Sequence, residues 1–96
     1  MYSVTDVADF NQKSANPECS IVLTDELVCQ YYRPWHDSRG NEYSQVWTCI
    51  GHEVHEWLMV HTHITAEVIE HLTLCVIQFQ NPSDMIQFKL SFDWNT

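Results

Sequence analysis

Residues 55–90 carry the clearest periodic signals in the chain, and they constrain its fold most strongly. Alternating side chains along 55–64 predict an extended strand with one mostly apolar face. Thr65 is a good helix N-cap, so 65–72 is predicted to be a short helix. Residues 73–80 are almost continuously apolar, which favours a central strand. A last helix is predicted over 84–92.

The predicted order of elements in this segment is therefore strand, helix, strand and helix. If its two strands share one sheet, they form a parallel pair joined by a right-handed crossover. Ser83, after Asn81 and Pro82, is the expected cap of the last helix. The expected core positions are Leu58, Val60, Ile69, Cys75, Ile77, Phe79 and Phe88.

A β-hairpin is predicted before this segment. Residues 36–41 are polar, end in Gly-Asn and lie between aromatic runs, which is typical of a turn. The flanking strands are 27–35 and 42–50. A helix over 25–32, capped by Thr24, is the alternative for the first of them, although β-branched and aromatic residues favour a strand.

The N-terminal third predicts a helix and a strand. Ser3 and Asp6 suit a capping box for a helix over 3–14, which ends before Asn16-Pro17. Residues 19–23 predict a strand. Ninety-six residues make one domain, 1–96. We therefore expect an α+β fold with a mixed or antiparallel sheet of four to five strands and two or three short helices mainly on one face.

The charge balance is strongly acidic. Thirteen acidic and four basic residues give a net charge of −9. Such a charge disfavours nucleic acids and anionic membranes, and it favours a protein partner with a basic surface. Acidity that only aids solubility is the simpler alternative.

Sequence signals for secretion and membrane insertion are missing. The N-terminal ten residues lack a basic start and an apolar run, and no apolar run approaches about 20 residues. The four cysteines, at 19, 29, 49 and 75, form no CxxC motif. A reducing compartment, the cytoplasm, is therefore expected, with the cysteines as core residues.

Catalytic patterns are weak throughout. His52 and His55 are spaced i and i+3 around Glu53, whereas the zinc-protease motif needs i and i+4 on a helix. Cys49 and Cys75 lie beside no basic residue that would lower a thiol pKa. The sequence therefore predicts that the protein is not an enzyme and needs no cofactor.

Zinc binding is the chemical alternative. On a strand, His61 and His63 share a face, and His55 lies further along it. Three imidazoles and a water would suit zinc. The simpler alternative is that these histidines only solvate a half-exposed face.

Aromatic and arginine side chains gather in the predicted hairpin. A strand alternates its faces, so some of them are expected to be exposed. Tyr, Trp and Arg are common anchors of protein interfaces, while packing of a small core is the alternative. The candidate partner-binding residues are Tyr32, Arg33, Trp35, Arg39, Tyr43 and Trp47.

The segment 76–94, VIQFQNPSDMIQFKLSFDW, resembles small phage-encoded proteins of unassigned role. The shared pattern is an aromatic-rich strand, an acidic turn and a short helix ending in Phe-Lys-Leu-x-Phe/Trp. Phe88, Lys89, Leu90 and Phe92 occupy the matching places in the last third of the chain. The resemblance implies a viral protein of a kind that binds and blocks a host protein.

The first functional hypothesis is thus a non-enzymatic, acidic, phage-encoded interaction protein. It would bind and inhibit or redirect a host protein, with anti-CRISPR or related anti-defence activity and host takeover as concrete forms. The alternative is a metal-binding protein that uses His55, His61 and His63. Homodimerisation through an exposed edge strand is a third hypothesis.

Overall fold

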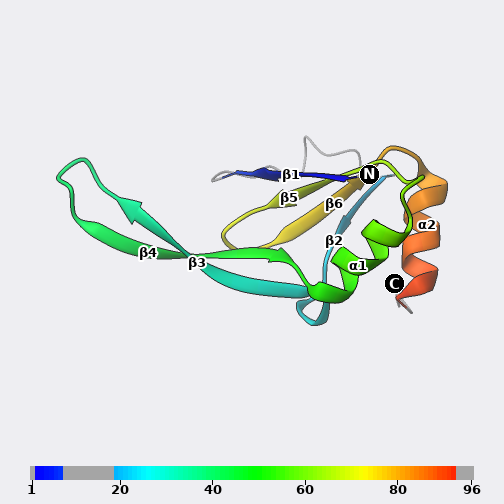
Figure 1. Cartoon of the computed structure of the whole chain (residues 1–96), viewed down its shortest axis with the longest axis horizontal. Coiled ribbons are helices and arrows are strands. Elements are labelled where there is room, and N and C mark those ends of the chain that lie inside the picture. Colours follow the sequence, from blue (N-terminus) through cyan, green and yellow to red (C-terminus); the bar gives the residue numbers. More distant parts are fainter. Residues whose placement is uncertain (1, 8–18, 93–96) are drawn as a thin grey trace.

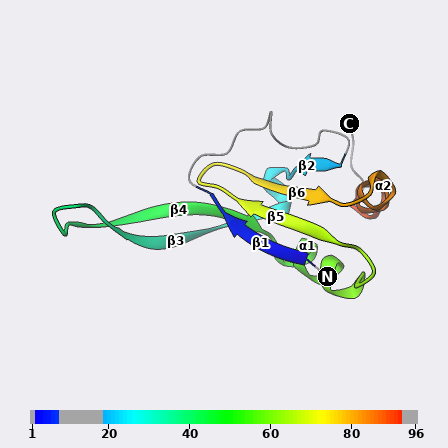
Figure 2. The same cartoon turned by 90° about the horizontal axis from the view of Figure 1, so that it is seen from above.

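The computed structural model describes residues 2–7 and 19–92, and a mixed four-stranded sheet forms its body. The strands lie in the order β1 (Tyr2–Asp6), β5 (Ala66–Glu70), β6 (Cys75–Phe79) and β2 (Ser20–Val22). β1 runs parallel to β5, whereas β6 is antiparallel to both of its neighbours. Figure 2 shows the four strands side by side, with β1 and β2 at the edges.

A second sheet consists of β3 (Val28–His36) and β4 (Glu42–Ile50), which form an antiparallel hairpin. The predicted hairpin and its turn are therefore confirmed. The alternative helix over 25–32 is wrong, because only the short 3-10 turn η2 (Asp25–Leu27) precedes β3. Together with the helices α1 (His52–Val60) and α2 (Pro82–Ser91), these elements confirm the α+β class.

Both helices pack on one face of the four-stranded sheet. Val68 and Ile77 point to this face from the two central strands, and both are fully buried. Val54 and Leu58 of α1 and Phe88 of α2 join them in one hydrophobic cluster. The expected core positions are buried except Val60, whose side chain is 76% exposed.

The strand predicted over 55–64 is wrong, because His52–Val60 is a helix. Val54 and Leu58 are four residues apart and buried, and Trp57 is half-buried between them in sequence. That spacing has the period of a helix, and it competes with the alternation on which the strand prediction rested. The helix turns Val60 towards solvent.

The helix predicted over 65–72 is also wrong, because Ala66–Glu70 is strand β5. Consecutive residues of β5, such as Val68 and Ile69, are buried although their side chains point to opposite faces of the sheet. Periodicity alone does not separate such a buried run from a helix. The expected parallel pair of 55–64 and 73–80 is wrong as well, since most of 55–64 lies in the helix α1 and both neighbours of β6, β5 and β2, are antiparallel to it.

Two predictions near the chain ends need correction. Tyr2–Asp6 is a strand rather than the start of a helix over 3–14, and residues 8–14 lie outside the described part of the chain. Tyr2, Val4 and Thr5 are good strand formers, and pairing with β5 outweighs the capping signal. The last helix begins one residue after Asn81, so its N-cap is Asn81 and not Ser83.

The hairpin projects far beyond the body of the molecule (Figure 1). The described residues extend over 48 × 27 × 25 Å and have a radius of gyration of 14.5 Å. A compact chain of this length would have a radius of about 12.5 Å. The distal half of β3 and β4 accounts for the elongated shape (Figures 1 and 2).

Candidate functional site

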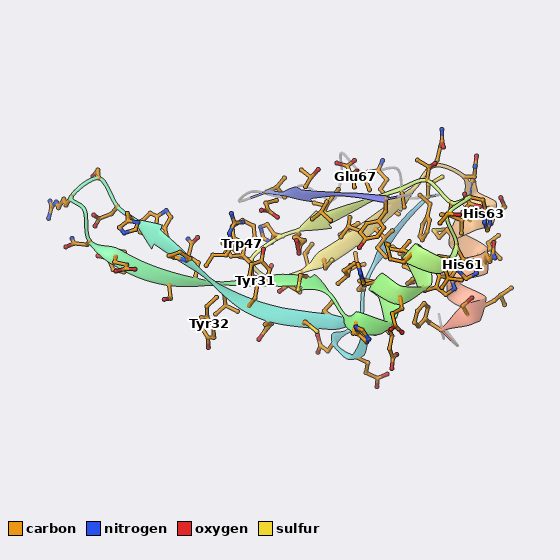
Figure 3. The ribbon with its side chains drawn as sticks, in the orientation of Figure 1. Tyr31, Tyr32, Trp47, His61, His63 and Glu67 are labelled. Carbon is orange, nitrogen blue, oxygen red and sulfur yellow. The ribbon has the colours of Figure 1, made fainter. Side chains whose placement is uncertain are left out.

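The two faces of the hairpin differ in what they contact. Residues paired across the strands point to the same side, so Tyr31 and Trp47 share one face and Tyr32 and Val46 share the other. Figure 3 shows Trp47 on the side of the four-stranded sheet and Tyr32 on the opposite side. Trp47 is 7% exposed, whereas Tyr32 is 76% exposed.

The base of the hairpin is anchored to the body by the Thr48 backbone and side chain. The Thr48 N–H donates to the His71 carbonyl at 2.8 Å, and its hydroxyl donates to the Leu72 carbonyl at 3.2 Å. Thr48 itself is buried. These bonds fix the direction in which the hairpin leaves the body.

A polar cluster lies where the hairpin meets the sheet, and we call it the junction: Asp6, Tyr31, Arg33 and Glu70. Arg33 donates to Asp6 at 2.7 Å, and its guanidinium carbon lies 4.7 Å above the ring of Trp47. Asp6 and Glu70 are register partners on β1 and β5, so two carboxylates lie close together.

Burial and mutual repulsion perturb the junction. Glu70 is 9% exposed, and its burial raises the pKa of its carboxyl, with a further rise from Asp6 and an opposing effect of Arg33. Burial also raises the pKa of Tyr31, with Glu70 and Asp6 adding to the effect. The single arginine therefore faces two carboxylates that repel each other.

The distal half of the hairpin is a different surface. Trp35 and Tyr43 are paired across the strands with ring centroids 5.3 Å apart, and they are 44% and 48% exposed. Arg39 lies exposed in the turn, where Gly40 adopts a φ of +82° that favours glycine. We call the exposed residues Tyr32, Trp35, Arg39 and Tyr43 together the hairpin patch, in which Trp35 and Tyr43 lie on one face of the hairpin and Tyr32 lies on the opposite face.

The Asp37 side chain organises the turn. Its carboxylate accepts hydrogen bonds from the backbone N–H groups of Arg39 and Asn41, each at 2.9 Å. The bond from the Asn41 N–H is the largest cause that lowers the pKa of Asp37. An ordered turn keeps the ends of the two strands, and therefore Trp35 and Tyr43, in one arrangement.

Four of the six predicted partner-binding residues thus lie in the hairpin patch. Arg33 and Trp47 instead belong to the contact between hairpin and body. At 7% exposure, Trp47 has almost no surface to offer a partner. The sequence could not separate the two groups, because the alternation of faces does not say which part of a hairpin rests on the body.

The three histidines of the predicted metal site do not share a strand face. His55 lies on α1 and bonds through Nδ1 with the Tyr2 hydroxyl. His61 stacks on Trp57 with centroids 4.1 Å apart, and its ring centroid is 5.9 Å from that of His63 (Figure 3). Within residues 2–7 and 19–92, no group of three or more His, Cys, Asp or Glu is placed to hold a metal ion.

The cysteines predicted as weak nucleophile candidates are shielded. Cys75 is fully buried, and burial raises the pKa of its thiol to about 12. Burial also raises the pKa of the half-buried Cys49. Neither environment increases the thiolate fraction that nucleophilic catalysis needs.

A groove that sequence reasoning missed lies between β1 and α1. Its volume is about 370 Å³, and Tyr2, Val4, Leu58, Met59 and Thr62 line it. The sequence gives no signal for this groove, because the local patterns of 3–14 and 55–64 favour a helix and a strand where the structure has β1 and α1. Val4 and Met59 are at least half-exposed along it.

No helix in the described residues combines the length and the apolar character needed to cross a membrane. Comparison of the chain with protein-family models, with curated proteins and with solved structures finds no match in any of the three.

Proposed function

We propose that the protein is a non-enzymatic interaction protein that binds another protein through the hairpin patch. The observation that carries the proposal is the placement of three exposed aromatic side chains, Tyr32, Trp35 and Tyr43, on an element that projects from the body. Aromatic side chains contribute large contact areas at interfaces and have few rotamers to lose.

The distribution of charge supports the same proposal. The hairpin residues 28–50 contain two arginines and two acidic residues and are formally neutral, so the net charge of −9 arises from the rest of the chain. A formally neutral aromatic hairpin can enter a pocket without carrying a net charge into it. The acidic body would then steer the approach to a basic partner surface.

The resemblance of 76–94 to small phage-encoded proteins suggests a more specific proposal for the partner. The partner would be a host protein in the cytoplasm, and binding would inhibit or redirect it, with a defence complex such as CRISPR as one target. Expression in a bacterial strain with an active defence system tests this more specific proposal. Restored plating of a targeted phage supports it, and unchanged plating counts against it.

Binding itself is tested with the full chain immobilised and incubated with host lysate. We expect a stoichiometric partner whose capture is lost with Trp35→Ala/Tyr43→Ala, at an unchanged melting temperature. Leu90→Ala is the matched control, since Leu90 is 78% exposed on α2. Once the partner is purified, the double variant should weaken binding about 30-fold or more. Full retention would remove the hairpin patch from the site.

Association of two copies is a distinct outcome, and the purified protein alone tests it. A homodimer would show as a doubled mass in sedimentation velocity without any lysate. If Trp35→Ala/Tyr43→Ala converts such a dimer to a monomer, the hairpin patch binds a second copy of this chain. That outcome would replace the host partner in the proposal.

Zinc binding is the second candidate, and the proximity of His61 and His63 supports it. Two imidazoles leave a zinc site one or two protein ligands short, because the His55 ring is turned to Tyr2. Elemental analysis of untagged protein after dialysis against buffer containing zinc decides the matter. A zinc content lost in His61→Ala/His63→Ala supports the site, and an absence of zinc in the parent protein rejects it.

A further inference from the structure

We propose that Cys29 and Cys49 form a reversible disulfide when the protein meets a small-molecule disulfide such as oxidised glutathione. The two residues are direct partners across β3 and β4 at the base of the hairpin. Both thiols are free in this structure. The Cys49 thiol already reaches across the strand pair and donates to the Cys29 carbonyl at 3.4 Å.

The backbone places this pair within reach of a disulfide. The Gly51 N–H donates to the Leu27 carbonyl at 2.8 Å, and the antiparallel register runs on without interruption to the turn. Hydrogen-bonded pairs alternate along such a ladder, so Cys29 and Cys49 form one, with Cα atoms about 5.5 Å apart. Disulfides span Cα separations of about 4.4–6.8 Å.

The same geometry makes the bond easy to break. Cβ atoms lie further apart in a hydrogen-bonded pair than in a non-hydrogen-bonded pair, and a disulfide needs a Cβ separation of only about 3.5–4.5 Å. Closing the bridge therefore pulls the two strands slightly together and stores strain. Strained and exposed disulfides are the labile ones.

Exposure decides the order of the reaction. The Cys29 side chain is exposed, whereas Cys49 is half-buried, and its burial together with Glu70 raises the pKa of its thiol. The Cys29 thiolate attacks oxidised glutathione, forms a mixed disulfide and releases one glutathione thiolate. Cys49 then loses its proton to solvent and attacks the Cys29 sulfur of the mixed disulfide. This attack forms the Cys29–Cys49 bond and releases the second glutathione thiolate. Two protein thiols are oxidised, and one glutathione disulfide is reduced to two thiols.

The other two cysteines are excluded by burial. Cys75 has no exposed surface and Cys19 is 5% exposed, so neither meets the reagent in the folded protein. The bridge would tie β3 to β4 where the hairpin leaves the body, without touching the hairpin patch. It is thus independent of the proposed partner and would be observed in the protein alone.

Glutamate-specific cleavage gives a direct test, because each cysteine falls on a different peptide. Cuts after Glu18, Glu26, Glu42, Glu53 and Glu70 separate all four thiols. The full-length protein is incubated with oxidised glutathione, and its intact mass is recorded after acid quenching. The remaining free thiols are then alkylated with N-ethylmaleimide in urea near neutral pH, and the protein is cleaved and analysed by mass spectrometry. We expect a mass loss of about 2 Da and a linked pair of peptides carrying Cys29 and Cys49. Excess reduced glutathione should remove the link.

Variants and a denatured control make the test specific. Cys49→Ser should keep one glutathione on Cys29, since no second thiol displaces it, and Cys19→Ser should react like the parent protein. In urea, four thiols can form about six different first disulfides, so about one in six would join Cys29 to Cys49 by chance. The proposal is overturned if the fraction of disulfide that joins Cys29 to Cys49 is no higher in the native protein than in urea. It is also overturned if both of these thiols can still be alkylated after incubation with excess oxidised glutathione.

Discussion

The Arg33 guanidinium donates to the Asp6 carboxylate at 2.7 Å and thereby joins the projecting hairpin to the N-terminal strand. It also lies over the ring of Trp47, and its charge opposes the rise in the pKa of the buried Glu70 carboxyl. Each contact is modest, because both members of the ion pair are 39% exposed. Their combination on one side chain makes Arg33 the centre of the junction.

Removal of Arg33 should therefore cost more than removal of its ion-pair partner. Arg33→Ala leaves two neighbouring carboxylates uncompensated and uncovers Trp47, for an expected loss of about 1–3 kcal/mol. Asp6→Asn loses the ion pair but relieves the repulsion of Glu70, so its cost should stay below about 1 kcal/mol. Urea denaturation at neutral pH measures both. Equal losses would mean that Arg33 acts only through Asp6.

Protonation of Glu70 should increase the free energy of unfolding in mild acid. Its folded-state pKa is raised above the ordinary value of 4.5, first by burial and then by Asp6, while Arg33 opposes the rise. Protonation therefore favours the folded state, a contribution that is complete below pH 4.5 and lost as the pH rises through the raised value.

Glu70→Gln mimics the protonated carboxyl, so it should raise the melting temperature at pH 7 by a few degrees. The difference from the parent protein should shrink as the pH falls towards 4.5, because a raised pKa means that Glu70 is more than half protonated in the folded protein at that pH. Melting curves from pH 4 to pH 8 would show this convergence. A Gln variant that is less stable at pH 7 would indicate that attraction to Arg33 outweighs burial.

The hairpin, the last strand and the last helix were predictable because local signals agree with the fold there. The turn at 36–41 has both an Asp side chain that binds backbone N–H groups and a glycine with positive φ. The apolar run that becomes β6 is bounded by polar residues, and Pro82 suits the first turn of α2. Neighbouring residues suffice to specify these elements.

The sequence patterns predict a strand over 55–64 and a helix over 65–72, whereas the structure has a helix over 52–60 and a strand over 66–70. This reversal has a physical reason. Helix-forming residues in Ala66–Glu70 are overridden by pairing on both sides with β1 and β6. The pairing with β1 depends on residues more than 60 positions away, which no local pattern contains, whereas β6 follows β5 directly in the sequence. The division of the hairpin into an anchored base and an exposed distal half depends equally on long-range contacts.

Gly51 illustrates a constraint set by such a contact. A Cβ at this position would lie 2.8 Å from the Leu27 carbonyl oxygen, to which the Gly51 N–H also donates. Gly51→Ala should therefore push β4 away from the η2 turn and cost about 1–3 kcal/mol. Urea denaturation provides the measurement.

Gly40→Ala is the informative comparison for Gly51→Ala. Its Cβ would meet no atom within 4 Å, so only the positive φ of +82° opposes the substitution. The expected cost is about 1–2 kcal/mol, confined to the turn. If Gly51→Ala proves neutral while Gly40→Ala does not, the close approach of Gly51 to Leu27 is relaxed in solution.

Phe88 and Leu90 test how α2 is held on the sheet, because they lie two residues apart on one helix and differ completely in burial. Phe88 has no exposed surface and contacts Trp57, Phe79 and Phe92, with ring centroids 4.7–5.6 Å apart. Phe88→Ala should cost about 3–5 kcal/mol, since it leaves a cavity among three aromatic rings. Leu90→Ala, at 78% exposure, should change the free energy of unfolding by less than about 0.5 kcal/mol. Similar losses for the two variants would show that α2 packs through a different face.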